Sequence, residues 1–433
     1  MHIARVNVIV GLATLLVIPD LALWAQVHKP VPSPQPANVE ALLETAQQAL
    51  NRNDFAEAVK ALEAVVEAQP DMSTAWFNLG YAYTGLHKDA DAIKAYQKTL
   101  ELTPDLFAAR LNLGILLLEG KQPQAALAHL EKATALKPEH ARAHLYYGRA
   151  LAQSDQPAAA RKQFQEAIRL DPAMAIAQFD LGQLELQQKN PAEALAAFQK
   201  TLSLDPKLPQ AELGAALACE GMKDAAQATG HFEKYLAMKP DDLETRFHLA
   251  RLYLQQNQNE PARDSLETVY RAKPDLPGLT AALGDVYSLL KKLPEAEKFY
   301  RLALATQPDV ADLHRALGQT LLDEQKYPEA EGEFRAALKL DSHSRDSAYG
   351  LATALYFEKR YADAVPLLEA LARAPDPPPF LFFVLATCYD HLQARKEALA
   401  NYQRFLGLSH GQAPDQEWQA QQRAKLLRRE LGK

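Results

Sequence analysis

Apolar and polar residues along this chain follow a fixed period of 34 residues, numbered as places 1 to 34 from Val39. Small residues stand at places 8 and 20 of each period, and mostly larger apolar residues stand at places 7, 11, 24 and 28. Spacings of three and four residues put such positions on one face of an α-helix. The pattern predicts two amphipathic helices in each period, packed against each other through their small residues.

Prolines mark the period most clearly, because they recur at place 32 in each of the first eight units. The run is Pro70, Pro104, Pro138, Pro172, Pro206, Pro240, Pro274 and Pro308. A proline there ends the second helix of a unit. Further prolines near the start of several second helices, where a missing N–H is harmless, are Pro123, Pro157, Pro191, Pro261, Pro294 and Pro328. So strict a period indicates one unit copied in tandem, and eleven units fit residues 39–412.

The two helices of each unit are predicted to approach closely. Place 20 is always alanine: Ala58, Ala92, Ala126, Ala160, Ala194, Ala228, Ala262, Ala296, Ala330, Ala364 and Ala398. Place 8 is glycine or alanine: Ala46, Gly80, Gly114, Gly148, Gly182, Ala216, Ala250, Gly284, Gly318, Ala352 and Ala386. Glycine inside a helix costs about 1 kcal/mol. Repeating that cost indicates that the paired helices leave no room for a side chain at this place.

The second unit carries the most specific pattern. Its residues are Trp76, Leu79, Gly80, Tyr83, Ala92, Tyr96 and Pro104. This pattern resembles the tetratricopeptide repeat, with tyrosine in the place usually held by phenylalanine. The resemblance extends over residues 39–412 and implies an all-α, right-handed α-solenoid of about eleven helix-turn-helix repeats. Such repeats are stabilised mainly by contacts with their neighbours.

The end of the array and its sixth unit depart from the pattern. Ser342, Asp376 and His410 replace proline at place 32 of the last three units. Residues 413–433 are predicted to form a capping helix. Gly214 and Gly230 make the sixth unit either a soft joint or a rigid unit with poor packing, and the sequence leaves both open.

Residues 1–25 are predicted to be a signal peptide, because Arg5 precedes an apolar run over residues 6–18 and small residues stand at Ala22 and Ala25. The alternative is an uncleaved N-terminal membrane anchor, since residues 6–25 approach the roughly 20 residues that cross a bilayer. Residues 26–38, which hold several prolines, are predicted to form an extended spacer rather than a helix. We therefore expect an exported protein, periplasmic or secreted, or else one anchored to the inner membrane.

The sequence carries no motif for catalysis or for binding a cofactor. Its net charge of −7 gives no general attraction to nucleic acid. His140 and His144 are spaced like metal ligands, but they fall in a turn and at the start of the next helix, so we expect no metal site. Cys219 and Cys388 lie five units apart, too far for a disulfide. We expect no enzymatic activity, no cofactor and no nucleic-acid partner.

The resemblance also implies where a partner binds, since the first helix of each such repeat lines the concave surface. Places 2, 5, 6, 9, 12 and 13 should face that surface, and the candidate peptide-binding residues are Asn78, Tyr81, Asn112, Arg142, Tyr146, Arg149 and Asp180. We expect Asn78 and Asn112 to be exposed, with amides that can donate to and accept from a peptide backbone. The arginines suit an acidic group. The alternative, that all of these are ordinary solvated residues, stays open.

Together these features predict a non-catalytic scaffold that binds a peptide or protein segment along the concave face of the repeats, in the periplasm or cell envelope. Two alternatives remain. One is an envelope assembly or trafficking factor anchored by its N-terminal segment, and the other is a substrate-presenting or regulatory arm for a catalytic partner on another chain. A membrane contact is expected only if the N-terminal segment is uncleaved. The sequence leaves the oligomeric state open.

Overall fold

The computed structural model describes residues 36–432, in which 23 α-helices follow one another without a strand. The helices up to residue 239 are α1 Pro36–Asn51, α2 Phe55–Ala68, α3 Ser73–Gly85, α4 Asp89–Leu102, α5 Phe107–Glu119, α6 Pro123–Leu136, α7 Ala141–Gln153, α8 Pro157–Leu170, α9 Ala175–Gln187, α10 Pro191–Leu204, α11 Pro209–Gly221 and α12 Ala225–Met238. The later helices are α13 Leu243–Gln255, α14 Asn259–Ala272, α15 Leu279–Leu289, α16 Leu293–Thr306, α17 Ala311–Asp323, α18 Tyr327–Leu340, α19 Arg345–Phe357, α20 Tyr361–Ala372, α21 Pro379–His391, α22 Arg395–Ser409 and α23 Pro414–Leu431.

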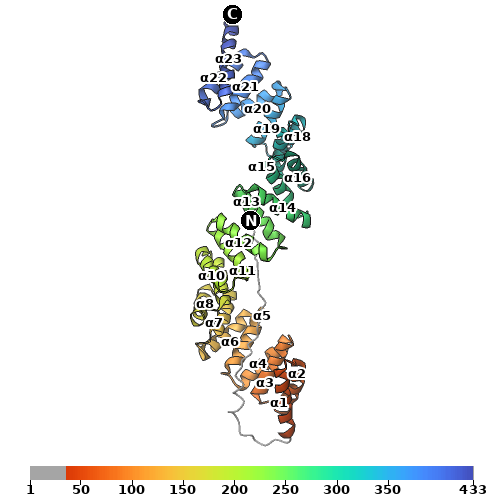
Figure 1. Cartoon of the computed structure of the whole chain (residues 1–433), viewed down its shortest axis with the longest axis vertical. Helices are drawn as coiled ribbons and strands as arrows, with labels where there is room; N and C mark the ends of the chain where they lie inside the picture. Colours follow the sequence, from red (N-terminus) through yellow and green to blue (C-terminus); the bar gives the residue numbers. More distant parts are fainter. Residues whose placement is uncertain (1–35, 433) are drawn as a thin grey trace. The chain divides into compact units, whose positions relative to one another are not determined.

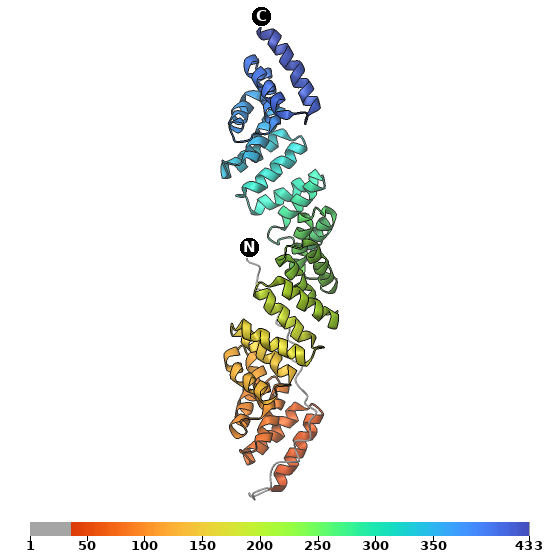
Figure 2. The same ribbon diagram turned by 90° about the vertical axis from the view of Figure 1, so that its left-hand side faces the viewer.

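The chain divides into two compact units, Met1–Lys239 and Pro240–Lys433. In each unit the helices pack as consecutive pairs, and each pair packs on the next one along the chain (Figure 1). The turned view in Figure 2 shows the same order of pairs within each unit. The expected all-α solenoid of helical repeats is confirmed.

Close contact between paired helices explains the small residues at places 8 and 20. A Cβ atom added to Gly80 would lie 2.9 Å from the Tyr96 ring, and one added to Gly148 would lie 2.7 Å from the Phe164 ring. Any side chain at either position would therefore force the aromatic residue at place 24 to move. The place-20 alanines are fully buried from Ala58 onward. The packing predicted from the sequence is confirmed.

The turn inside each pair holds a residue that the sequence pattern did not single out. Place 15 has a left-handed backbone, with φ between 56° and 65°, in all eleven pairs of the described region. The residues are Asn53, His87, Lys121, Asp155, Lys189, Lys223, Asn257, Lys291, Gln325, Lys359 and Gln393. None of them is glycine, although a side chain in this conformation costs free energy. The turn is therefore imposed by the packing of the two helices it joins.

A hydrogen bond to the proline turn recurs between successive repeats. The Trp76 indole Nε1 donates to the Pro70 carbonyl at 2.9 Å, and the Arg110 Nε donates to the Pro104 carbonyl at 2.9 Å. The same link joins His144 to Pro138, Arg246 to Pro240 and His314 to Pro308. Each donor stands at place 4, and the proline whose carbonyl accepts lies two residues beyond the end of the preceding helix.

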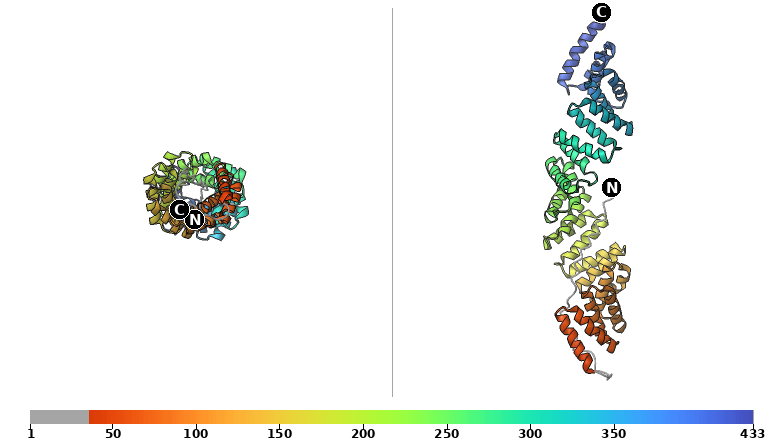
Figure 3. Two further views of the ribbon diagram at one scale, coloured as in Figure 1. Left: turned by 90° about the horizontal axis from the view of Figure 1, so that it is seen from below. Right: turned by 90° about the vertical axis from the view of Figure 1, so that its right-hand side faces the viewer.

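The two ends of the array differ from the predicted boundaries in detail. The helix α1 begins at Pro36, so residues 36–38 are helical and do not belong to an extended spacer. Proline fits the first turn of a helix because its missing N–H has no partner there in any case. The predicted signal peptide and the rest of the spacer lie outside the described residues. At the other end α23 packs against α22, at the blue end of the chain in Figure 3.

The sixth repeat is closely packed where it meets the fifth. A Cβ atom on Gly214 would lie 2.5 Å from the tip of the Phe198 ring. Ala211, Ala215 and Ala216 are fully buried around it. The small residues at this junction therefore accommodate an aromatic ring, which favours the rigid alternative for the contact between these two repeats. No helix among the described residues is long and apolar enough to cross a membrane.

Candidate functional site

The first helices of successive repeats contact one another directly within the unit Met1–Lys239. The contacts run from α5 to α7, from α7 to α9 and from α9 to α11. Successive pairs therefore come closest on the side of their first helices. The candidate residues from the sequence all lie on first helices of repeats: Asn78 and Tyr81 on α3, Asn112 on α5, Arg142, Tyr146 and Arg149 on α7, and Asp180 on α9.

Four of the candidates form one group, named the Tyr146 cluster: Arg142, Tyr146, Arg149 and Asp180. The guanidinium carbons of Arg142 and Arg149 lie 5.7 Å and 5.3 Å from the centre of the Tyr146 ring. Arg149 Nε donates to Asp180 Oδ2 at 2.5 Å, and this contact joins α7 to α9. Because cations are attracted to the face of an aromatic ring, Tyr146 positions both guanidinium groups.

Burial shapes the electrostatics of the Tyr146 cluster. The Asp180 side chain is only 11% exposed and that of Arg149 is 25% exposed. Burial raises the pKa of the Asp180 carboxyl, and the adjacent Arg149 guanidinium lowers it in part. Burial also raises the pKa of Glu119, where Asp89 adds repulsion and Arg149 again acts in the opposite direction. The Arg149 charge is therefore shared between carboxylates of the protein itself.

The remaining candidates do not join this cluster, and one expectation about them is wrong. Asn112 is buried rather than exposed, at 7%, because its Nδ2 donates to the Tyr96 hydroxyl at 3.3 Å. Burial raises the pKa of Tyr96 to about 12. Asn78 is half-buried. Tyr81 is half-buried with its ring edge-on to Phe55 at 6.0 Å.

The two histidines with metal-like spacing are engaged in local contacts. His140 Nδ1 accepts from the Ala143 N–H at 3.1 Å and caps α7. His144 places its two ring nitrogens 2.7 Å from Gln163 Oε1 and 2.9 Å from the Pro138 carbonyl. Within residues 36–432 no group of three or more His, Cys, Asp or Glu side chains is arranged to hold a metal ion.

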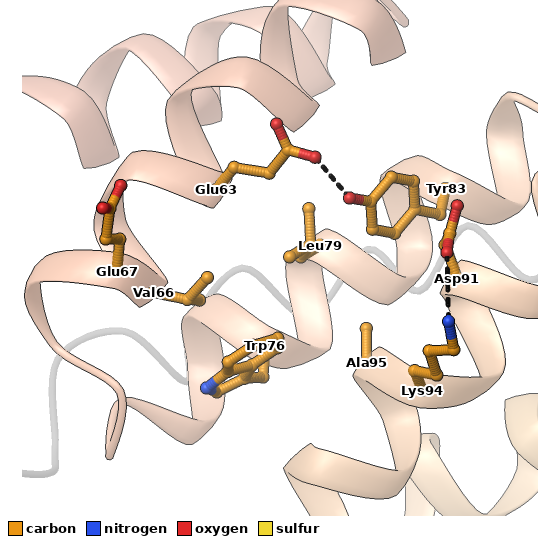
Figure 4. A pocket seen from close by; sticks show the side chains of 9 residues that line it. All are labelled: Glu63, Val66, Glu67, Trp76, Leu79, Tyr83, Asp91, Lys94 and Ala95. Atoms are coloured by element: carbon orange, nitrogen blue, oxygen red, sulfur yellow. Dashed lines mark hydrogen bonds and ion pairs between the residues drawn. The ribbon is translucent and has the colours of Figure 1, made fainter.

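A pocket that the sequence analysis missed lies between α2, α3 and α4 (Figure 4). We name it the Trp76 pocket. It has a volume of about 310 Å³ and is lined by Glu63, Val66, Glu67, Trp76, Leu79, Tyr83, Asp91, Lys94 and Ala95. The Tyr83 hydroxyl donates to Glu63 at 2.5 Å. A sequence signal for it exists, because a tyrosine at place 11 follows a glutamate at place 25 of the preceding repeat in four places along the chain.

Models of one protein family match most of the repeat array. Two models described as "Tetratricopeptide repeat" match residues 43–107, 150–209 and 315–379 and residues 117–173 and 220–275. The chain belongs to the tetratricopeptide repeat family. The predicted family is thereby confirmed, and repeats of this family generally bind protein or peptide partners.

Several solved structures are similar to parts of this tetratricopeptide repeat protein. MamA from Desulfovibrio magneticus RS-1 is 26% identical, with 39% of this chain and 96% of that chain covered and a TM-score of 0.38. PilF of Pseudomonas aeruginosa is 23% identical over 47% of this chain and 93% of that one, with a TM-score of 0.41. YrrB, described as a repeat protein with an unusual peptide-binding site, is 21% identical over 46% and 100%, with a TM-score of 0.39. No curated protein matches the chain.

Proposed function

We propose that this protein is a non-catalytic scaffold that holds an extended segment of a partner protein across α7 and α9. Membership of the tetratricopeptide repeat family supports the general role. We place the binding site on α7 and α9 because the Tyr146 cluster fixes two guanidinium groups on the side where successive first helices come closest.

The chemistry of the Tyr146 cluster suits a segment with exposed carbonyl oxygens and an acidic side chain. Guanidinium groups make charge-assisted hydrogen bonds to such oxygens. Arg149 is already paired with Asp180, so it holds the ring and the neighbouring helix in position. Arg142 is half-buried against the same ring. Because a guanidinium group has five N–H donors, we assign Arg142 to the oxygens of the partner. The order imposed by Tyr146 lowers the entropy lost when a segment binds.

We further propose that the protein is exported and that residues 1–25 act as a signal peptide. The support is the order of Arg5, an apolar run and small residues in the sequence. The working location would then be the periplasm or the cell envelope. N-terminal sequencing of the mature protein tests this point, since a start at Gln26 supports cleavage and a start at Met1 contradicts it.

Site-specific photo-crosslinking in cells tests the binding role. Gln183→p-benzoylphenylalanine places the crosslinker on α9 without removing a residue of the Tyr146 cluster, and Lys162→p-benzoylphenylalanine places it at an exposed position on α8. We expect a discrete adduct with another protein from position 183 and none from position 162. Equal crosslinking at both positions, or none at position 183, would contradict the proposed site.

A further inference from the structure

A hydrogen bond between a tyrosine and a glutamate recurs at several junctions between repeats, and three of these junctions are compared below. Tyr83 donates to Glu63 at 2.5 Å, Tyr287 donates to Glu267 at 2.5 Å, and Tyr389 donates to Glu369. The tyrosine is always at place 11 and the glutamate at place 25 of the preceding repeat. The three junctions therefore present one equivalent carboxylate each.

Two of these three glutamates also receive an arginine from their own helix. Arg271 Nη2 donates to Glu267 at 3.1 Å on α14, and Arg373 Nη2 lies 3.6 Å from Glu369. Both arginines stand at place 29, one helical turn after the glutamate. At these two junctions, the glutamate that accepts from the tyrosine therefore also binds a guanidinium group.

The first junction has a glutamate where the other two have an arginine. Glu67 occupies place 29 there, next to Glu63 on the same face of α2. Both side chains are exposed, and among residues 36–432 neither forms an ion pair with a lysine or arginine. Two lysines are close to the site, but Lys94 lies 3.8 Å from Asp91 and Lys88 lies over the Tyr83 ring.

The first junction is also the one with a hollow beside the glutamate. Val66, Leu79 and Ala95 are buried at the floor of the Trp76 pocket. In Figure 4 the Trp76 and Tyr83 rings stand on either side of Leu79, with Glu63 and Glu67 above Val66. The Trp76 indole is held in place by its hydrogen bond to Pro70. An aliphatic stem can lie on such a floor while its charged end reaches the carboxylates.

We propose that the Trp76 pocket binds an arginine side chain of a partner protein. The partner guanidinium takes the position that Arg271 and Arg373 occupy at the other two junctions, against Glu63 and Glu67. Its stem covers Val66 and Leu79, and its planar head has the Trp76 ring as a further contact. This site lies on α2–α4 and is independent of the proposal for the Tyr146 cluster on α7 and α9.

Binding of the peptide Ser-Gly-Arg-Gly-Ser to the full chain, followed by ligand-observed NMR and by tryptophan fluorescence, tests the proposal. The matched probe replaces arginine by citrulline, which keeps the shape and removes the charge. We expect the citrulline peptide to bind at least about tenfold more weakly, since the charge-assisted contacts are lost. A lysine peptide should bind with intermediate strength, because it lacks the planar, forked head.

Glu67→Arg is the decisive variant, because it gives the first junction the residue found at the other two. The new arginine should pair with Glu63 and reduce binding of the arginine peptide by at least about tenfold. Glu139→Arg makes the same charge change at an exposed position outside the pocket and should leave binding unchanged. If Glu67→Arg fails to fold by circular dichroism, the pair Glu63→Gln and Glu67→Gln replaces it. Equal binding of the two peptides, undetectable binding of both, or full binding by the Glu67 variant would overturn the proposal.

Discussion

The first helices α5 and α9 carry a polar residue at the same place of the repeat, yet the two residues have different partners. Asn112 on α5 donates to the hydroxyl of Tyr96, which stands at place 24 of the preceding repeat. Asp180 on α9 follows a repeat with Phe164 at place 24, and it accepts from Arg149 instead. The comparison indicates that the residue at place 24 decides whether a polar side chain at place 6 hydrogen-bonds to that residue or pairs with a charged residue of the neighbouring first helix.

Two other junctions show why these two places act together. The tip of the Phe198 ring meets Gly214, and the tip of the Phe334 ring meets Gly350, so the ring at place 24 points at place 6 of the next repeat. A tyrosine adds a hydroxyl at that tip and requires a polar partner. By the same geometry, the Phe164 ring is directed toward Asp180 without a polar atom of its own.

Removing the carboxylate from the Tyr146 cluster should change the stability of the protein more than any other substitution proposed here. We expect Asp180→Ala to lower the free energy of unfolding by about 2 kcal/mol, because it leaves the guanidinium of Arg149 partly buried without its main partner. Urea unfolding followed by circular dichroism measures the loss. Arg149→Leu with Asp180→Leu is the control, and it should recover part of the loss. A single variant as stable as the parent would show that the pair is no more than a surface contact.

Exchanging the residues at place 24 tests the comparison directly. Tyr96→Phe should cost about 1 kcal/mol, since the Asn112 amide then lacks an acceptor in a buried position. Phe164→Tyr should cost less than about 0.5 kcal/mol, since Asp180 can accept from the new hydroxyl. Thermal and urea unfolding of both variants provide the ranking. The opposite ranking would mean that place 24 does not control place 6.

Sequence reasoning predicted the parts of this fold that depend on one residue type at a fixed place. The glycine at place 8 and the alanine at place 20 predict close helix pairs, and Gly80 against Tyr96 confirms them. The burial of Asn112 was not predictable in the same way, because its partner Tyr96 belongs to another repeat. The left-handed turns were missed because residues such as Lys121 and Asn53 share no obvious signal.

The candidate sites show the same limit. Arg142, Tyr146 and Arg149 could be grouped from their spacing on one helix, whereas the contact with Asp180 required the stacking of the next repeat. The Trp76 pocket depends on Glu63 and Tyr83, which come from different repeats. Periodicity assigns a residue to a face, and the neighbouring repeat decides what that face can bind.

Another tyrosine at place 24, Tyr300, allows a test by pH. The Tyr300 hydroxyl donates to Asp285 at 2.8 Å, and burial raises the pKa of the Asp285 carboxyl, which the Tyr300 hydrogen bond and Arg315 lower in part. A carboxyl with a raised folded-state pKa binds more protons in the folded than in the unfolded state. Its contribution to stability therefore falls as the pH rises from about 3.9, its unfolded value, through the folded pKa.

Asp285→Asn removes this titration and keeps an oxygen that can accept from Tyr300. We expect the stability of the parent relative to Asp285→Asn to decrease as the pH rises above about 3.9, the unfolded value of an aspartate. Urea unfolding at a series of pH values gives the difference between the two proteins. A difference that does not change with pH, or that changes in the opposite direction, would contradict the raised pKa.

The smallest expected change in stability concerns the left-handed turns inside the helix pairs. The stability of these turns should not depend on the residue at place 24. Lys121 and Lys189 are both exposed lysines with a left-handed backbone, at φ values of 56° and 61°. Glycine adopts this conformation without steric cost, so each Lys→Gly substitution should raise the free energy of unfolding by about 0.5 to 1 kcal/mol. Thermal unfolding measures the gain. Lys121 follows the helix with Asn112 and Lys189 follows the helix with Asp180. Equal gains would confine the difference between the two regions to the contact of places 6 and 24, whereas unequal gains would show that this contact also strains the turn.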